Sequence, residues 1–220
     1  MNKRITLSFD NGPDPEVTPY VLDILRRRDI LASFFVLGDK LRDRRASCER
    51  AYDEGHWIGN HTFNHLVPLG MSDVAGYAAY EMRRTQELLH GLTHEENFFR
   101  PFGGGGLLDE RLFNKEAYAC LLEHAYTCVL WNSVPGDWKD PEGWPDIALQ
   151  QAAQHEHTLM VLHDLPTQAM LNLESFIDRA LDQGYRFVQE FPEDCVPVRR
   201  GVERASMDAY VNRKNSVFSG

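Results

Sequence analysis

Residues 5–11 read Ile-Thr-Leu-Ser-Phe-Asp-Asn, a short β-branched and aromatic run that ends in two polar side chains. A run of this kind predicts a buried β-strand. Residues 16–28 follow with apolar side chains at the three- and four-residue spacing of an amphipathic helix. A strand followed by such a helix is the repeating unit of parallel α/β folds. This opening segment therefore favours a sheet whose strands are connected through helices.

The same alternation continues along the chain. Further strands are expected at residues 33–37, 57–59, 97–100, 127–131, 158–162 and 185–188, and further helices at residues 40–54, 72–92, 109–124, 144–155 and 169–183. Right-handed crossovers would pair these seven strands in parallel, either in an open sheet or in a closed barrel. No Pro- or Ser-rich linker interrupts the pattern. We therefore predict one domain over residues 1–220, with residues 190–220 as a C-terminal extension.

The overall charge excludes several function classes. The chain has 220 residues, with 23 Lys and Arg against 33 Asp and Glu, for a net charge of −10. This excess of negative charge disfavours nucleic acid and anionic membrane surfaces as partners. No apolar run reaches the roughly eighteen residues of a membrane helix, so we expect no membrane insertion. We recognise no signal peptide and predict a cytoplasmic location. The oligomeric state is left open.

Polar side chains stand at or shortly after the expected C-terminal ends of several strands. In closed α/β barrels, the chemistry is located at this end of the strands. A convergence of polar groups on one face therefore predicts an active site there. The groups concerned are Asp10, Asn11, His61, His65, Arg100, Asp137, Trp138, His163 and Asp164.

The pair His61 and His65 has the four-residue spacing that places two imidazoles on one face of a helical turn. Two imidazoles so placed can bind one metal ion, and the alternative is a pair of surface histidines after a strand. No Glu follows His61, so a zincin-type protease is disfavoured. A hydrolytic zinc site needs a third protein ligand, which the end of the first strand, at Asp10 and Asn11, could supply.

His163 closes the apolar run of residues 159–162. A histidine at the end of a buried strand can be a core residue with satisfied hydrogen bonds. At the active face of a barrel it can equally serve as a general acid. Both interpretations remain open from the residues alone.

Five short stretches in order resemble the motifs of the polysaccharide deacetylases, the NodB-homology family also called carbohydrate esterase family four. They are residues 8–12 (SFDNG), 61–65 (HTFNH), 100–103 (RPFG), 134–138 (VPGDW) and 160–163 (MVLH). The resemblance extends from residue 5 to about residue 188. It departs from the family pattern at Asn11 and at Val134, where the first and fourth motifs have Asp.

The resemblance implies a distorted (β/α)7 barrel and a role for each matching residue. Asp10 would be the general base, Arg100 the residue that tunes it and His163 the general acid. His61, His65 and Asn11 would hold a divalent metal, for which zinc is our prediction. We predict that four residues bind the substrate: Phe102, Gly103, Asp137 and Trp138.

The implied activity is hydrolysis of an N-acyl group, with N-acetyl on a sugar or a related small molecule as the first choice. One alternative is hydrolysis of a linear or cyclic amide that is not a sugar. A second is a catalytically silent barrel that binds carbohydrate through Trp131, Trp138 and Trp144. A binding protein needs neither a base nor an acid, so the joint presence of Asp10 and His163 favours the enzyme.

Overall fold

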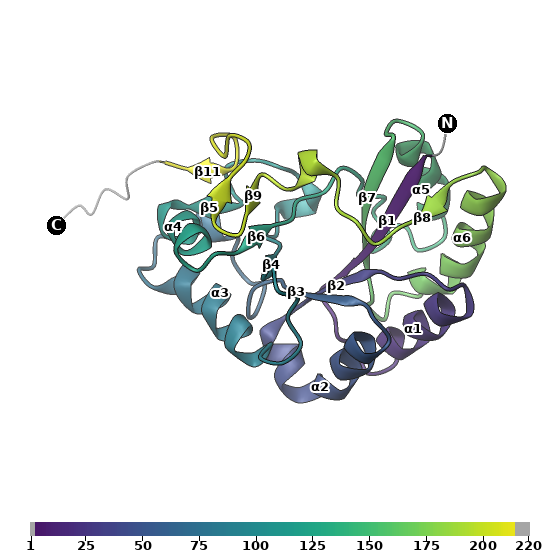
Figure 1. Cartoon of the computed structure of the whole chain (residues 1–220), viewed down its shortest axis with the longest axis horizontal. Coiled ribbons are helices and arrows are strands. Elements are labelled where there is room, and N and C mark those ends of the chain that lie inside the picture. Colours follow the sequence, from purple (N-terminus) through teal and green to yellow (C-terminus); the bar gives the residue numbers. More distant parts are fainter. Residues whose placement is uncertain (1–2, 214–220) are drawn as a thin grey trace.

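The computed structural model describes residues 3–213. The strands lie around the middle of the molecule, and the helices pack on the outside of the strands (Figure 1). The order in the large sheet is β10-β9-β6-β4-β3-β2-β1-β7, and β8 pairs with β1. The strands of this sheet are β1 (Arg4–Asp10), β2 (Ser33–Val36), β3 (Trp57–Asn60), β4 (Phe98–Phe99), β6 (Thr127–Cys128), β7 (His157–His163), β8 (Arg186–Phe187), β9 (Val198–Arg199) and β10 (Val202–Glu203). The helices are α1 (Val17–Arg27), α2 (Gly38–Asp53), α3 (Tyr77–Leu88), α4 (Lys115–Glu123), α5 (Trp144–Ala152) and α6 (Leu173–Asp182).

Strand β1 has one neighbouring strand along the whole of one edge and two along the other. Strand β7 pairs with it in parallel over all seven residues. On the opposite edge, β8 pairs with the first two residues of β1 and β2 pairs with the last three. A bridge between Ser133 and Met160 joins the segment after β6 to β7, and the Val161 N–H donates to the Ser133 carbonyl at 2.9 Å. This contact closes the distorted barrel that the family resemblance implied.

The helices cover the barrel with the faces on which they bury their apolar residues. Helix α1 buries Val21, Leu22, Ile24 and Leu25 against β1 and its neighbours, within the largest core cluster. A second cluster joins α3 and α4 to β4 and β6. No helix in the described part of the chain is long and apolar enough to cross a membrane.

All seven predicted strands are present, but several predicted helices begin later than expected. The helix expected from Ser72 begins at Tyr77, after Gly76 in a left-handed conformation. The helix expected from residue 109 begins at Lys115, because the preceding β5 (Phe113–Asn114) pairs with β11 (Val211–Asn212) and the Asn114 side chain then caps the helix. Before α6, residues 169–172 form the 3₁₀ helix η3 (Ala169–Asn172). Pairing with a segment far away in sequence decided the β5 boundary, so local periodicity could not reveal it.

The C-terminal segment, residues 190–213, forms part of the barrel. Strand β9 extends the main sheet by pairing with β6. The short helix η4 (Glu193–Cys195) places Cys195 in an interior cluster with Phe35, Phe98, Val129 and Leu159. Residues 190–213 of the predicted C-terminal extension therefore help to fill and extend the barrel. The rest of the predicted extension, residues 214–220, lies outside the described residues.

Candidate active site

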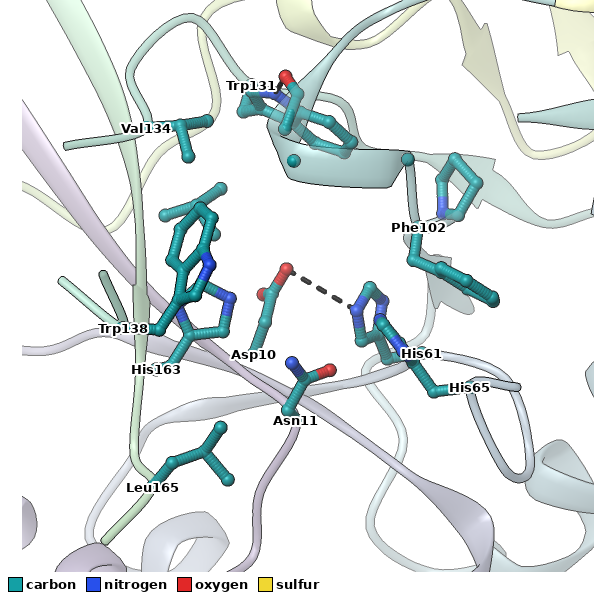
Figure 2. A pocket seen from close by; sticks show the side chains of 15 residues that line it. Asp10, Asn11, His61, His65, Phe102, Trp131, Val134, Trp138, His163 and Leu165 are labelled. Atoms are coloured by element: carbon teal, nitrogen blue, oxygen red, sulfur yellow. Dashed lines mark hydrogen bonds and ion pairs between the residues drawn. The ribbon is translucent and has the colours of Figure 1, made fainter. Parts of the chain in front are cut away.

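A cavity of about 290 Å³ opens where the loops after β1, β3, β4, β6 and β7 converge. This is the C-terminal end of the parallel strands, as the sequence predicted. Figure 2 shows Asp10 at the centre, with His61 on one side and His163 on the other. The predicted site residues that line the cavity are Asp10, Asn11, His61, His65, Phe102, Gly103, Trp138 and His163.

The two histidines meet in a loop, where we had expected a helical turn. The segment after β3 is not helical, and Thr62 and His65 both have positive φ angles, 72° and 56°. Buried Glu81 of α3 accepts hydrogen bonds from the N–H groups of Phe63 and Asn64, at 2.9 and 3.0 Å. The imidazole centroids lie 5.1 Å apart. Tertiary hydrogen bonds therefore bring the two rings together, and helical spacing plays no part.

Both imidazoles are in a form that can bind a metal. His61 Nδ1 lies 2.8 Å from the Arg100 carbonyl, so it carries the proton and leaves Nε2 free to face the cavity. Burial lowers the pKa of His61. Burial and the nearby His61 lower the pKa of His65 to about 3. Neutral imidazole is the metal-binding form of histidine.

Asn11 supplies a third group beside the pair. Its amide oxygen is buried, and none of the hydrogen bonds among the described residues reaches it. In Figure 2 this oxygen points toward His61 and His65. An unpaired buried oxygen is costly unless another partner satisfies it, so its placement fits a cation ligand. Within residues 3–213, no group of three or more His, Cys, Asp or Glu side chains could hold a metal ion. The fit therefore depends on the Asn11 amide.

The buried side chain of Arg100 holds Asp10 in place. Arg100 Nη1 donates to Asp10 Oδ1 at 2.8 Å and to Ser8 Oγ at 2.7 Å. The second carboxylate oxygen of Asp10 lies 3.6 Å from His61 Nε2. Arg100 is fully buried and does not line the cavity. Arg100 is thus a positioning residue that acts through Asp10 and has no direct access to the cavity.

His163 is oriented by Asp137 on the opposite wall. Asp137 accepts two hydrogen bonds from His163, one from the backbone N–H and one from Nδ1, both at 2.9 Å. Burial alone would lower the pKa of His163, but the hydrogen bond and charge of Asp137 outweigh it and raise that pKa. Asp137 is itself fully buried and is absent from the cavity wall. It orients His163 and does not bind substrate directly, which corrects our prediction.

The remaining walls are aromatic and apolar. The Phe102 ring stacks on His65 at a centroid distance of 3.7 Å, and the Trp138 ring meets His163 edge-on at 4.7 Å. Trp131 and Val134 complete the rim with Gly105 and Gly106. Trp144, which we had considered for sugar binding, is fully buried at the start of α5 and takes no part.

Residues 1–127 match the family profile described as polysaccharide deacetylase, which is more than half of the chain. The chain belongs to the polysaccharide deacetylase family. It is thus a hydrolase of carbon–nitrogen bonds other than peptide bonds.

Two curated relatives and one solved structure illustrate this membership. The peptidoglycan-N-acetylglucosamine deacetylase of Bacillus cereus is 31% identical over 196 residues, covering 84% of this chain and 85% of that protein. The peptidoglycan-N-acetylmuramic acid deacetylase PdaA of Bacillus subtilis is 30% identical over 192 residues, covering 84% and 69%. The structure of peptidoglycan deacetylase PdaC from B. subtilis superposes with a TM-score of 0.70 at 29% identity, covering 85% of this chain and 87% of that one.

Two buried carboxyl groups support this site: Glu81, which sequence reasoning missed, and Asp164, which it placed at the active face without a role. Glu81 holds the histidine loop, as described above. Asp164 follows His163, accepts a hydrogen bond from Thr18 and lies against Gly12, where a Cβ would collide with its carboxylate. Burial raises the pKa of Asp164 to about 7. The position of Asp164 beside His163 was visible in the sequence, whereas nothing local distinguished Glu81 from an exposed helix residue.

Proposed function

We propose that this chain is a metal-dependent deacetylase that removes the acetyl group from the nitrogen of an N-acetylated sugar. The observation that carries the proposal is the unpaired, buried Asn11 amide oxygen, which faces two neutral imidazoles beside Asp10. Its relatives are named for peptidoglycan N-acetylglucosamine and N-acetylmuramic acid, so we propose a glycan of this kind as the substrate.

His61 Nε2, the free imidazole nitrogen of His65 and Asn11 Oδ1 would hold a divalent cation, with zinc as our prediction. The ion would supply Lewis-acid polarisation of the acetyl carbonyl and of the attacking water. All three donors are uncharged, so the ion would keep more of its positive charge than in a site with a carboxylate ligand.

Asp10 is the base in this proposal. Its Oδ1 is occupied by Arg100, which leaves Oδ2 free to take a proton from water in the cavity. The charge-assisted hydrogen bond from buried Arg100 fixes the direction of the carboxylate. A backbone N–H at Phe102 or Gly103 would stabilise the oxyanion that forms on the acetyl group.

His163 is the acid. An amine leaves poorly unless its nitrogen is protonated, so the reaction needs a proton donor on the wall opposite the histidine pair. Asp137 raises the pKa of His163 and therefore keeps the ring protonated at higher pH than a free histidine. Asp10 and His163 thus divide the two proton transfers between opposite walls of one cavity.

The test combines metal analysis with acetate release. Purified protein is analysed for bound metal and assayed on N-acetylglucosamine oligomers and on peptidoglycan. We expect one divalent ion per chain, lost in His61→Ala and in His65→Ala, because two remaining ligands bind too weakly. His90→Ala is the control, since His90 lies outside the cavity. Unchanged metal content in both site variants would refute the metal site, and no acetate from any glycan would refute the activity. The cytoplasmic location stays a prediction.

A further inference from the structure

Lys139 places a positive charge at the mouth of the cavity. Its Nζ lies 5.3 Å from the centroid of the Trp138 ring. The same atom lies 3.8 Å from the position that a Cβ on Gly105 would occupy. Trp138 and Gly105 line the cavity from two different loops. The ammonium group therefore stands where these two walls meet.

The Lys139 ammonium group lies over the Trp138 ring but has no acidic partner among the described residues. No ion pair among residues 3–213 involves Lys139. The acidic groups nearby already have partners, since Asp137 binds His163 and Asp140 accepts a hydrogen bond from the Gly143 N–H at 2.9 Å. In a chain with a net charge of −10, a cation at the cavity mouth that lacks an acidic partner is available for a ligand.

The adjacent wall carries no negative charge that would oppose an anionic ligand. The residue there is Val134, which packs on Gly106. A Cβ atom added to Gly106 would lie 2.9 Å from Val134 Cγ1. Val134 lines the cavity next to the Gly105 position that Lys139 approaches. One rim of the cavity thus combines an unpaired cation with an apolar surface.

We infer that Lys139 selects an N-acetylated sugar that carries a carboxylate beside its acetamido group, as N-acetylmuramic acid does. The inference rests on the proposed function and specifies its substrate class. Trp138 contacts His163, the proposed proton donor to the amine, so Lys139 lies on the amine side of the cavity. In muramic acid, the lactyl ether is attached to the ring carbon next to the one that bears nitrogen. With the nitrogen at His163, a carboxylate on the neighbouring carbon would be close to the part of the cavity that Lys139 borders.

The experiment compares N-acetylmuramic acid with its lactyl carboxamide, which has nearly the same shape but no charge. Acetate release gives kcat/KM for each, and calorimetric titration gives the binding of each. We expect the wild-type enzyme to favour the acid by about fivefold, the effect of one partly screened ion pair. Lys139→Gln should remove that preference and Lys139→Arg should keep it. Lys115→Gln, which removes the same charge from exposed Lys115 of α4, should not change it.

Equal kcat/KM and equal binding of the two ligands by the wild-type enzyme would overturn the inference. So would a Lys139→Gln variant that still prefers the acid, or one that loses the same factor on both ligands. Deacetylation of N-acetylglucosamine oligomers without preference for the acid would leave the proposed function intact. If no sugar releases acetate, the proposed function fails, and the binding titrations alone decide the role of Lys139.

Discussion

The two halves of the barrel differ in how much regular strand they contain. The half built from β1, β2, β3 and β7 has strands of four to seven residues, whereas β4 and β6 in the other half have two each. The long-strand half carries Asp10, Asn11 and His163 at or just beyond its strand ends. The short-strand half contributes mostly loops, which form the aromatic and glycine-rich rim. The proposed base and acid thus lie on the long-strand half, while the short-strand half forms the aromatic and glycine-rich wall of the cavity.

The largest effect should come from the long-strand half. Asp10→Asn should lower kcat/KM by about 10²–10⁴-fold, because it removes the general base. It should also destabilise the fold by roughly 3 kcal/mol, since fully buried Arg100 would lose its counter-charge. Acetate release and urea denaturation measure the two effects. The control Ser8→Ala removes another Arg100 partner but keeps the carboxylate. Activity of Asp10→Asn within a few-fold of wild type would exclude Asp10 as the base.

A smaller effect is expected at the adjoining ligand position. Asn11→Asp should bind zinc about tenfold more tightly, because an anionic ligand attracts a dication more strongly than an amide. Turnover should stay level or fall, as the polarised water becomes less acidic. Titration with zinc against a competing chelator measures the affinity. Equal or weaker binding by the Asp variant would mean that Asn11 is not a ligand.

The next effect depends on pH and links the two halves, because Asp137 comes from the short-strand half and His163 from the long-strand half. Asp137 raises the pKa of His163 above its usual 6.5, so the acid form persists at higher pH and activity falls only as pH rises through the raised value. Asp137→Asn should move this alkaline limb to lower pH and slow turnover at pH 8 about tenfold. A pH–rate profile measures the shift. An alkaline limb at the same pH in both proteins would mean that Asp137 does not set the pKa of the catalytic acid.

The contribution of the Asp137–His163 pair to the free energy of unfolding should also decrease as pH rises. Its contribution is fully present below pH 6.5 and is lost as pH rises through the folded-state pKa of His163. Urea denaturation across this range should therefore show a smaller pH dependence in Asp137→Asn than in the wild type. His163→Gln provides the matched control because it has no titrating ring.

The smallest effect should come from the wall of the short-strand half. Val134→Ala trims a half-buried side chain at the rim and should cost about 1 kcal/mol of stability or less. Its kcat/KM should stay within about threefold of wild type, because no proton or metal ligand changes. Steady-state kinetics and thermal unfolding measure both. A loss as large as that of Asp10→Asn would make the wall part of the chemistry and remove the contrast between the halves.

Prediction from sequence succeeded where a residue's role is set by its position along a strand. Residues 5–9 and 158–162 were predicted as strands because an apolar run of that length is buried on both faces in a parallel sheet. Asp10 and His163 then necessarily fall at the same end, since parallel strands share a direction. The alternation of strands and helices likewise specified the α/β class, and the order of the five motifs specified the family.

Only the tertiary structure decided how the side chains are used. Asp137 was predicted to bind substrate, whereas the fold buries it behind His163, just as it buries Arg100 behind Asp10. The histidine pair meets because Glu81 of α3 holds a non-helical loop, a contact between segments seventeen or more residues apart. Strand β5, in the middle of the chain, forms because β11 near the C-terminus pairs with it. Local sequence encodes periodicity and strand direction, whereas burial and long-range hydrogen bonds arise only once distant segments are packed together.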